Sequence, residues 1–313
     1  MKGGPGRRSV VIHAHFYQPP REDPWLELFE REPNAAPFHD WNERIDQECY
    51  RAVLAARLLD PRGAIRRIIN TLEFVSFNVG PTLLDWMERE SPSSYHRILA
   101  ADRASTLRLG HGNAIAMPYH HVILPLASHR DKVTEVRWGV ADFRRRFGRD
   151  PVGMWLPETA VDDDTLDVLA EAGIAFTILA PHQIKNAPSS GVAGRYLTKG
   201  GRAITILSYD GPLSHEVAFG PLIQDANAWV ERLLPADSTG PTLAAIATDG
   251  ETYGHHHRFG DLALAATIEG LNLRPAEVRL ENFASYLARH PAVDPVELVE
   301  PSAADRDALG RPA

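Results

Sequence analysis

The chain is poor in cysteine. Cys49 is the only cysteine among its 313 residues, so no disulfide can form within the chain and no cluster of thiolates can hold a metal ion. A chain without disulfides suits a reducing compartment. We therefore expect a cytoplasmic protein.

The sequence also lacks long apolar runs and an excess of basic residues. No stretch reaches the roughly 18 apolar residues of a membrane span, and the residues before His13 contain no apolar core of a signal peptide. The net charge of −8 provides no basic surface for a phosphate backbone. With 44% hydrophobic and 24% charged residues, the composition is that of a soluble globular protein. We expect neither a membrane nor a nucleic acid as partner.

Short apolar runs alternate with longer amphipathic runs along most of the chain, which is the pattern of βα units. The expected strands cover residues 9–13, 74–78, 106–110, 152–156, 175–179, 203–207 and 243–247. The expected helices lie around residues 42–59, 81–102, 130–147, 163–172, 215–234 and 260–270. Polar residues follow these strands, as they do at the carboxyl ends of barrel strands, where active sites form. The pattern predicts an α/β barrel with a parallel sheet, although an open, doubly wound sheet would give the same pattern.

The most informative stretch is residues 248–257, TDGETYGHHH, which follows the apolar run 243–247. Asp249 ends this expected strand, and the glycine after it lets the backbone approach a ligand closely. A carboxylate partly desolvated beside Tyr253 would have a raised pKa and could protonate a leaving group. Glu251 is a rival for this role. The alternative interpretation is a turn residue that bonds to its own backbone, as in many Asp-Gly turns.

A second acidic position, Glu158, follows the apolar segment 152–156. Pro157 cannot continue a central strand, so the carboxylate is expected just beyond the strand end, in the mouth of the barrel. Paired carboxylates at the ends of separate strands are what the cleavage of a glycosidic bond requires. The alternative is an ordinary acidic residue at the start of the next helix.

His13 and His15 lie two residues apart on an expected strand, so their side chains are on the same side of it. Together with Asp249, His255, His256 and His257 they could form a zinc centre of nitrogen and oxygen ligands. They could instead hydrogen-bond to sugar hydroxyls and orient a carboxylate. On residue types we favour the second interpretation.

Four segments resemble the regions that characterise glycoside hydrolase family 57. They read HAHFYQP at 13–19, GHGN leading to YHHVILPL within 110–126, WLPE at 155–158, and DGETYG at 249–254. They occur in the family's order along most of the chain. The longer stretch HAHFYQPPREDPW at 13–25 is similar to one subgroup of that family.

The resemblance implies a retaining enzyme that acts on α-glycosidic bonds, mostly of α-glucans, as an amylase, a 4-α-glucanotransferase or a branching enzyme. It implies Glu158 as the nucleophile and Asp249, rather than Glu251, as the general acid/base. It also implies an incomplete (β/α)7 barrel, with no metal and no cofactor. An oligo- or polysaccharide is then the expected partner, and the oligomeric state is not readable from the sequence.

The resemblance and the residue types together predict a set of residues that bind substrate. The set is His13, His15, Gln18, Trp25, His111, Tyr119, His121, Trp155, Asp210, Glu251, Tyr253 and His255. Flat rings on loops suit stacking against sugar faces, although most aromatic side chains belong to a core.

Residues 1–275 are expected to form the catalytic barrel, and residues 276–313 a short segment with a polar tail. Members of the family continue into a helical C-terminal domain, whereas only 64 residues follow Asp249 here. Two other functions stay open. One is a metal-dependent hydrolase or deacetylase on the same barrel, with His13, His15 and Asp249 as ligands. The other is a barrel that binds glycans without catalysis.

Overall fold

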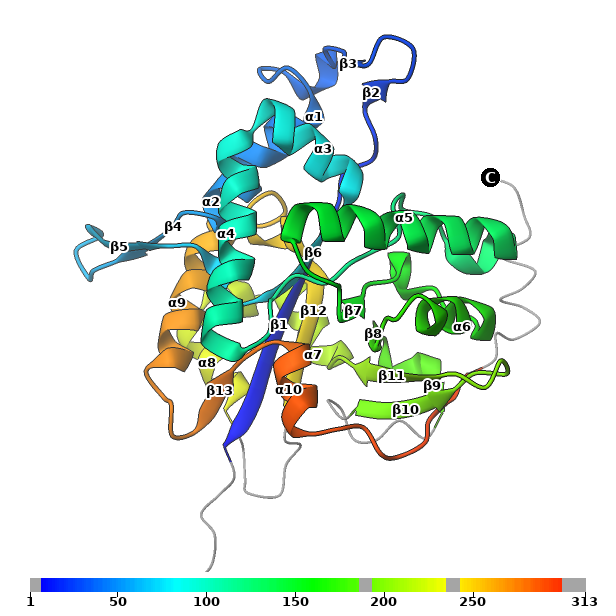
Figure 1. Cartoon of the computed structure of the whole chain (residues 1–313). Helices are drawn as coiled ribbons and strands as arrows, with labels where there is room; N and C mark the ends of the chain where they lie inside the picture. The colour runs from blue at the N-terminus through cyan, green and yellow to red at the C-terminus, as the bar shows by residue number, and fades with distance from the viewer. Residues whose placement is uncertain (1–6, 186–192, 235–242, 300–313) are drawn as a thin grey trace, which may run out of the picture.

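The computed structural model describes residues 7–185, 193–234 and 243–299, and parallel strands form its centre (Figure 1). In one sheet, β1 (Arg8–Phe16) pairs with β12 (Leu243–Asp249), β13 (Val278–Leu280) and β6 (Ser76–Val79), always in parallel. The second sheet has the order β10 (Ala193–Leu197), β11 (Ala203–Ser208), β8 (Phe176–Leu179), β7 (Gly153–Met154). In this sheet β10 is antiparallel to β11, and the other pairings are parallel.

Backbone hydrogen bonds connect the two sheets at two places. Residues 114–116 lie between β6 and β7, where the Ile115 amide donates to the Phe77 carbonyl (2.9 Å) and the Trp155 amide donates to the Ala116 carbonyl (2.8 Å). Just beyond β11, the Asp210 amide donates to a carbonyl of β12 (2.8 Å). The carboxyl ends of these strands therefore lie at the same side of the molecule.

Helices surround the strands (Figure 1). They are α1 (Trp41–Ile45), α2 (Arg51–Val53), α3 (Pro81–Glu90), α4 (Pro92–Leu109), α5 (His129–Phe147), α6 (Asp163–Glu171), α7 (Gly211–Phe219), α8 (Ala226–Leu233), α9 (Gly260–Asn272) and α10 (Phe283–Arg289). Proline occupies the first position of α3 and α4, where its missing amide hydrogen is not needed. Gly110 ends α4 in the left-handed conformation, with φ 77°.

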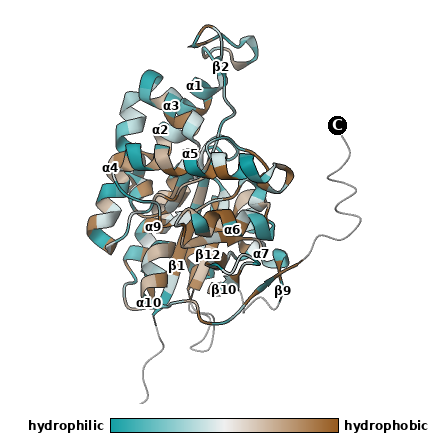
Figure 2. Ribbon diagram, turned by 45° about the vertical axis from the view of Figure 1, so that its right-hand side comes forward, coloured by the Kyte–Doolittle hydropathy of each residue, from teal (hydrophilic) through white to brown (hydrophobic). Residues whose placement is uncertain are grey.

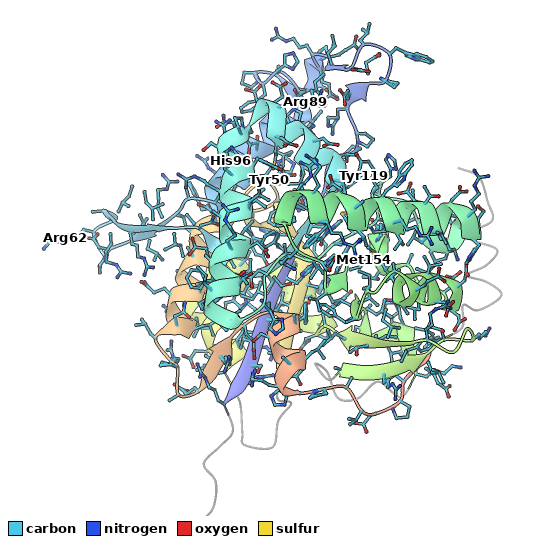
Figure 3. The ribbon with its side chains drawn as sticks, viewed as in Figure 1. Tyr50, Arg62, Arg89, His96, Tyr119 and Met154 are labelled. Atoms are coloured by element: carbon cyan, nitrogen blue, oxygen red, sulfur yellow. The ribbon has the colours of Figure 1, made fainter. Side chains whose placement is uncertain are left out.

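The apolar residues of the strands divide between two buried clusters, one of which also includes most of the covering helices. The central strands β1 and β12 are strongly hydrophobic (Figure 2), and all their residues from Val10 to Ile12 and from Leu243 to Ala247 are buried. Met154 of β7 lies deep in the molecule, whereas Arg62 lies at the tip of a projecting hairpin (Figure 3). A parallel sheet buried on both faces explains why the strands read as nearly continuous apolar runs.

Three small pairs of antiparallel strands lie outside the central sheets. They are β2 (Glu22–Asp23) with β3 (Leu28–Phe29), β4 (Ala56–Leu59) with β5 (Ile65–Ile69), and β9 (Ile184–Lys185) with β14 (Glu297–Leu298). The first two project from the body of the molecule (Figure 1).

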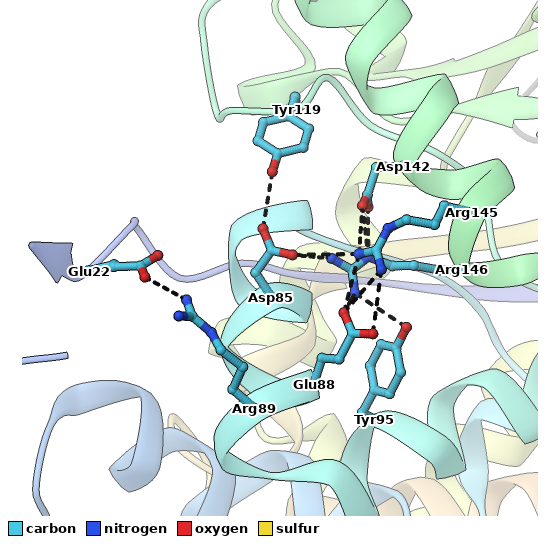
Figure 4. A network of polar contacts seen from close by, with 9 residues as sticks. All are labelled: Glu22, Asp85, Glu88, Arg89, Tyr95, Tyr119, Asp142, Arg145 and Arg146. Carbon is cyan, nitrogen blue, oxygen red and sulfur yellow. Dashed lines mark hydrogen bonds and ion pairs between the residues drawn. The ribbon is translucent and has the colours of Figure 1, made fainter. Parts of the chain in front are cut away.

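A buried arginine holds three of the covering helices together (Figure 4). The Arg146 side chain of α5 is fully buried and bonds to Asp85 and Glu88 of α3. Its Nε donates to both oxygens of Asp142 (2.9 Å each), and its Nη1 donates to the Tyr95 hydroxyl of α4 (3.3 Å). The charge of the guanidinium is thus compensated by carboxylates on two helices.

The structure confirms an α/β fold with a parallel sheet and corrects parts of the prediction. Residues 106–110 are not a strand, because α4 continues to Leu109; the extended segment is 114–116. The predicted helix 42–59 is interrupted by a π-helix at Asp46–Tyr50, and β4 begins at Ala56. The predicted helices 81–102 and 215–234 are each divided into two.

Two further expectations concern membranes and the C-terminal segment. No helix in the described ranges is long and apolar enough to cross a membrane. Residues 278–280 pair with β1 as β13, and α10 follows them. The polar tail predicted after residue 300 lies outside the described residues.

Candidate active site

A cavity of about 470 Å³ opens at the carboxyl ends of β1, β7, β11 and β12. Its lining comes from the ends of these strands, the turns that follow them and one face of α7. The residues are His15, Trp155, Glu158, Thr159, Tyr209, Gly211, Ser214, His215, Ala218, Phe219, Ala247, Thr248 and Asp249.

Both predicted catalytic carboxyl groups line this cavity. Asp249 is the last residue of β12 and lies beside His15 in the register of the sheet. Glu158 stands in a short turn after β7 with φ 55° and ψ 16°, and Thr159 follows with φ 53°. Left-handed residues other than glycine cost about 1–3 kcal/mol each and cluster at functional sites. The strained turn presents the exposed Glu158 carboxylate to the cavity.

The surroundings of Asp249 raise its pKa. Burial in the cavity wall raises the pKa of this carboxyl group, and the nearby Glu158 carboxylate raises it further. His256 and His121 act in the opposite direction. The net effect is a raised pKa. Asp249 therefore holds a proton more readily than an ordinary aspartate, as a general acid requires.

A chain of hydrogen bonds leads from the core to the cavity. The Ser76 hydroxyl lies 3.0 Å from His13 Nδ1, and His13 Nε2 lies 3.1 Å from Asn78 Oδ1. Asn78 Nδ2 donates to His15 Nδ1 (2.8 Å), and His15 Nε2 lies 3.2 Å from His121 Nε2. Since Asn78 accepts through its oxygen and donates through its nitrogen, His13 and His15 both carry their proton on Nε2. The chain fixes the tautomer and the orientation of His15 at the cavity.

Burial lowers the pKa of both His13 and His15 to about 3, so both rings are neutral. His13 is completely buried, is stacked on Trp155 (5.0 Å between ring centroids) and uses both ring nitrogens in hydrogen bonds. It can therefore neither bind a metal with Asp249 nor touch a ligand in the cavity. In the described part of the chain, no three histidine, cysteine or acidic side chains converge as a metal site. The metal centre considered from the sequence is not assembled.

Glu251 and Tyr253 lie beneath the cavity rather than in its wall. The Glu251 carboxylate accepts hydrogen bonds from the Tyr50 hydroxyl (2.5 Å) and the Tyr17 amide (3.4 Å). Burial raises the pKa of Glu251 to about 7. Tyr253 is fully buried, and its hydroxyl accepts a hydrogen bond from Thr248 (2.9 Å). Of the two acidic residues that competed for the same role, Asp249 is the one that lines the cavity.

Gln18 and His255 contact side chains near the site but do not line the cavity. Gln18 Oε1 accepts a hydrogen bond from Arg21 (3.3 Å). His255 Nδ1 lies 2.5 Å from a carboxylate oxygen of Glu48. His255 thus connects the segment after β12 to the π-helix Asp46–Tyr50, whereas the bond of Gln18 stays within the segment after β1.

Tyr119 and Asp210 are likewise engaged elsewhere. The Tyr119 hydroxyl donates to Asp85 (3.0 Å), and the Asp210 carboxylate accepts from the Leu213 amide (3.0 Å) and caps α7. His121, by contrast, stacks on Tyr17 beside the cavity (4.1 Å between ring centroids).

Trp25 and His111 are not brought to the cavity. Trp25 is 90% exposed, in the projecting segment between β2 and β3. His111 follows α4 and precedes the extended segment 114–116, so it lies at the amino end of that segment, and its carbonyl accepts a hydrogen bond from Asn282 (2.9 Å). The site is at the carboxyl ends of the strands.

The cavity also contains residues that sequence reasoning missed. Tyr209 directly follows β11, and Ser214, His215, Ala218 and Phe219 all belong to α7. The last three have the i, i+3, i+4 spacing of one helix face. This spacing, in a helix that starts directly after a strand end, is the sequence pattern that could have predicted these residues as part of the cavity.

Comparisons with known proteins give a family profile, related sequences and similar folds. Residues 19–298 match the family profile described as glycosyl hydrolase family 57. An alpha-amylase of Pyrococcus horikoshii is 26% identical over 199 residues, which are 61% of this chain and 30% of that protein. The crystal structure of a 4-alpha-glucanotransferase from Thermococcus litoralis superposes with a TM-score of 0.68 and 18% identity, covering 94% of this chain and 42% of that one. The crystal structure of a putative polysaccharide deacetylase from Mycobacterium smegmatis has a TM-score of 0.56, 17% identity, and coverage of 96% and 97%. The matched part thus spans less than half the length of the amylase and the glucanotransferase.

Proposed function

Because the chain belongs to glycosyl hydrolase family 57, we propose that it is a retaining glycoside hydrolase or glucan transferase acting on the α-glycosidic bonds of α-glucans. One observation carries the proposal: Glu158 and Asp249 come from the ends of separate strands and line the same cavity, where the Glu158 charge contributes to the raised pKa of Asp249. The names of the relatives, alpha-amylase and 4-alpha-glucanotransferase, support the same class of bond.

The proposed reaction has two displacement steps. In the first, a carboxylate oxygen of Glu158 attacks the anomeric carbon and forms a glycosyl ester, while Asp249 gives its proton to the departing glycosidic oxygen. In the second, the Asp249 carboxylate takes a proton from water or from an acceptor hydroxyl, whose oxygen attacks the same carbon and releases Glu158. The α configuration is inverted twice and thus retained. We expect the two carboxyl groups to lie about 5–5.5 Å apart when the enzyme acts.

The other residues of the cavity fit the binding of a sugar. His15 is held in one tautomer and has its ring at the cavity, beside the ring of Trp155 (5.4 Å between centroids). Tyr209 and His215 add polar groups to the lining of the cavity. We assign these four residues to the subsite where the bond is cleaved, and His13 to the support of His15.

We propose further that the parallel strands form a (β/α)7-type barrel built mainly by residues 1–275, and that the short C-terminal segment after it adds β13 (Val278–Leu280) beside β1. The hydrogen bonds that join β6 to β7 through residues 114–116, and the residue after β11 to β12, support this arrangement. The single cysteine suits the cytoplasm. An α-glucan is the proposed partner, without a cofactor.

Product analysis on a panel of α-linked oligosaccharides, with and without a chelator, tests the proposal. We expect cleavage or redistribution of chain lengths that resists the chelator and is lost in Glu158→Ala. Shorter products alone would identify a hydrolase, and longer products a transferase. Activity that the chelator abolishes, or undiminished turnover in Glu158→Ala, would contradict the mechanism.

A further inference from the structure

A second cavity, of about 670 Å³, lies on the other side of the loop that follows β12. It is larger than the first cavity and is lined by both polar and apolar side chains, among them Arg57, Gln224, His256 and Phe259. Its walls come from β4, the start of α8 and the start of α9. None of its residues takes part in the proposed reaction.

The two cavities are adjacent. His257 lines the second cavity and donates through Nε2 to the carbonyl of Ala218 (2.7 Å), which lines the first. His256, also of the second cavity, is close enough to Asp249 of the first for each to influence the other's protonation. A single layer of residues thus separates them.

An exposed aromatic ring stands at each cavity. Phe219 lines the first cavity and is 77% exposed, and Phe259 lines the second and is 56% exposed. Phe259 has φ 68°, a left-handed conformation that a bulky residue adopts only under strain. The Arg258 guanidinium lies 4.9 Å from the centre of its ring and covers one face. An exposed apolar ring at a strained position lowers stability, so a role in binding explains Phe259 better than packing does.

We infer that the second cavity binds a distant part of the same glucan chain whose bond is cleaved in the first, with Phe219 and Phe259 as stacking platforms along the path. The inference rests on the proposed function. A glucan chain presents flat apolar sugar faces bordered by hydroxyls. Phe259 matches the faces, and Arg57, Gln224 and His256 supply hydrogen-bonding groups for the hydroxyls. The second cavity therefore makes affinity depend on chain length.

Binding measured without turnover tests this inference. The full chain carrying Glu158→Gln is titrated with maltotriose and with maltoheptaose by calorimetry, alone and combined with Phe259→Asn. Asparagine tolerates the left-handed backbone, so this variant removes the ring without adding strain. Phe259→Tyr keeps the ring, and Leu273→Ala changes an exposed apolar residue at the other end of α9 as a matched control.

We expect Phe259→Asn to weaken the binding of maltoheptaose by about fivefold, which is the worth of one stacking contact. We expect little change for maltotriose, and none for either sugar in Phe259→Tyr or Leu273→Ala. Equal losses for both sugars, or no loss for the longer one, would overturn the inference.

These titrations measure affinity, and the product analysis described above measures turnover. Together they separate this inference from the proposed function. If the wild-type chain cleaves α-glucans but its affinity does not grow with chain length, only the inference fails. If affinity grows with chain length and no turnover of any α-glucan is found, only the proposed function fails. If no α-glucan binds at all, both fail.

Discussion

Replacing His13 by glutamine should make the fold less sensitive to acid. Burial lowers the pKa of His13 from 6.5 to about 3. Between these two pH values the unfolded chain binds a proton at this ring and the folded chain does not. The free energy of unfolding therefore falls as the pH falls through this window, and above it the ring has no effect on the pH dependence. Glutamine retains an N–H group that can donate to Asn78 but has no titrating ring.

The size of the effect follows from the width of the window. A difference of one bound proton changes the free energy of unfolding by about 1.4 kcal/mol per pH unit. From pH 6.5 to pH 4.5, His13 alone should thus lower the stability of the wild type by about 2–3 kcal/mol. His15 acts in the same direction, and Glu251, whose pKa is raised to about 7, acts in the opposite direction because its folded form keeps the proton. Both contributions are shared by the variant and cancel in the difference.

Urea unfolding at several pH values between 7 and 4.5 measures this difference. At pH 7 we expect His13→Gln to be less stable than the wild type, since its fit to the core is poorer. Towards pH 4.5 the difference between the two free energies of unfolding should change by about 2–3 kcal/mol in favour of the variant. His96→Gln, which removes an exposed histidine of α4 (Figure 3), should run parallel to the wild type. A His13→Gln curve that also runs parallel would refute the buried, neutral state of His13.

Three more substitutions test the packing around the site. Asn78→Leu should lower the free energy of unfolding by about 2–5 kcal/mol, because two buried imidazoles lose their partner. The control Thr177→Val removes one buried hydroxyl and should lower it by about 1 kcal/mol. Equal losses in the two variants would contradict the role of the hydrogen-bond chain. Gly250→Ala would place its new Cβ 2.2 Å from the Phe16 ring. We therefore expect both thermal stability and activity to fall. Unchanged activity would show that the adjacent catalytic loop does not need this close contact. Arg146→Met should lower the stability by about 1–3 kcal/mol, because it removes the buried cation that Asp142, Asp85 and Glu88 share, and an unchanged free energy of unfolding in urea would exclude that role.

Much of the fold could be predicted because its strands are short apolar runs with turn residues at their ends. The run 243–247 and the position of Asp249 at its end follow from hydropathy alone. The error at residues 106–110 has a physical origin. Alternating apolar and polar residues there fit a strand, yet the same residues form the last turn of α4, where Leu107 is 90% exposed. Gly110 was the signal of a helix end that favoured the correct interpretation.

The side chains of the site were harder to predict than its location. The spacing of His13 and His15 correctly places them on one side of the strand, but it does not show that His13 lies one layer deeper, where it is fully buried. At the end of β11 the polar residue chosen from the sequence was Asp210, which caps α7, whereas its neighbour Tyr209 lines the cavity. Which of two consecutive residues faces the ligand depends on the exact point where the strand ends.

Chemical rescue by azide tests the roles of the two carboxyl groups most directly. With an α-maltooligosaccharide that carries an activated aryl leaving group, Glu158→Ala should be nearly inactive, and azide should restore cleavage and give the β-glycosyl azide, because a single displacement inverts the configuration. Asp249→Ala with azide should give the α-glycosyl azide, because the ester at Glu158 still forms first. The opposite pair of products, or undiminished turnover in Glu158→Ala without azide, would contradict the assignment of Glu158 as nucleophile and Asp249 as acid/base.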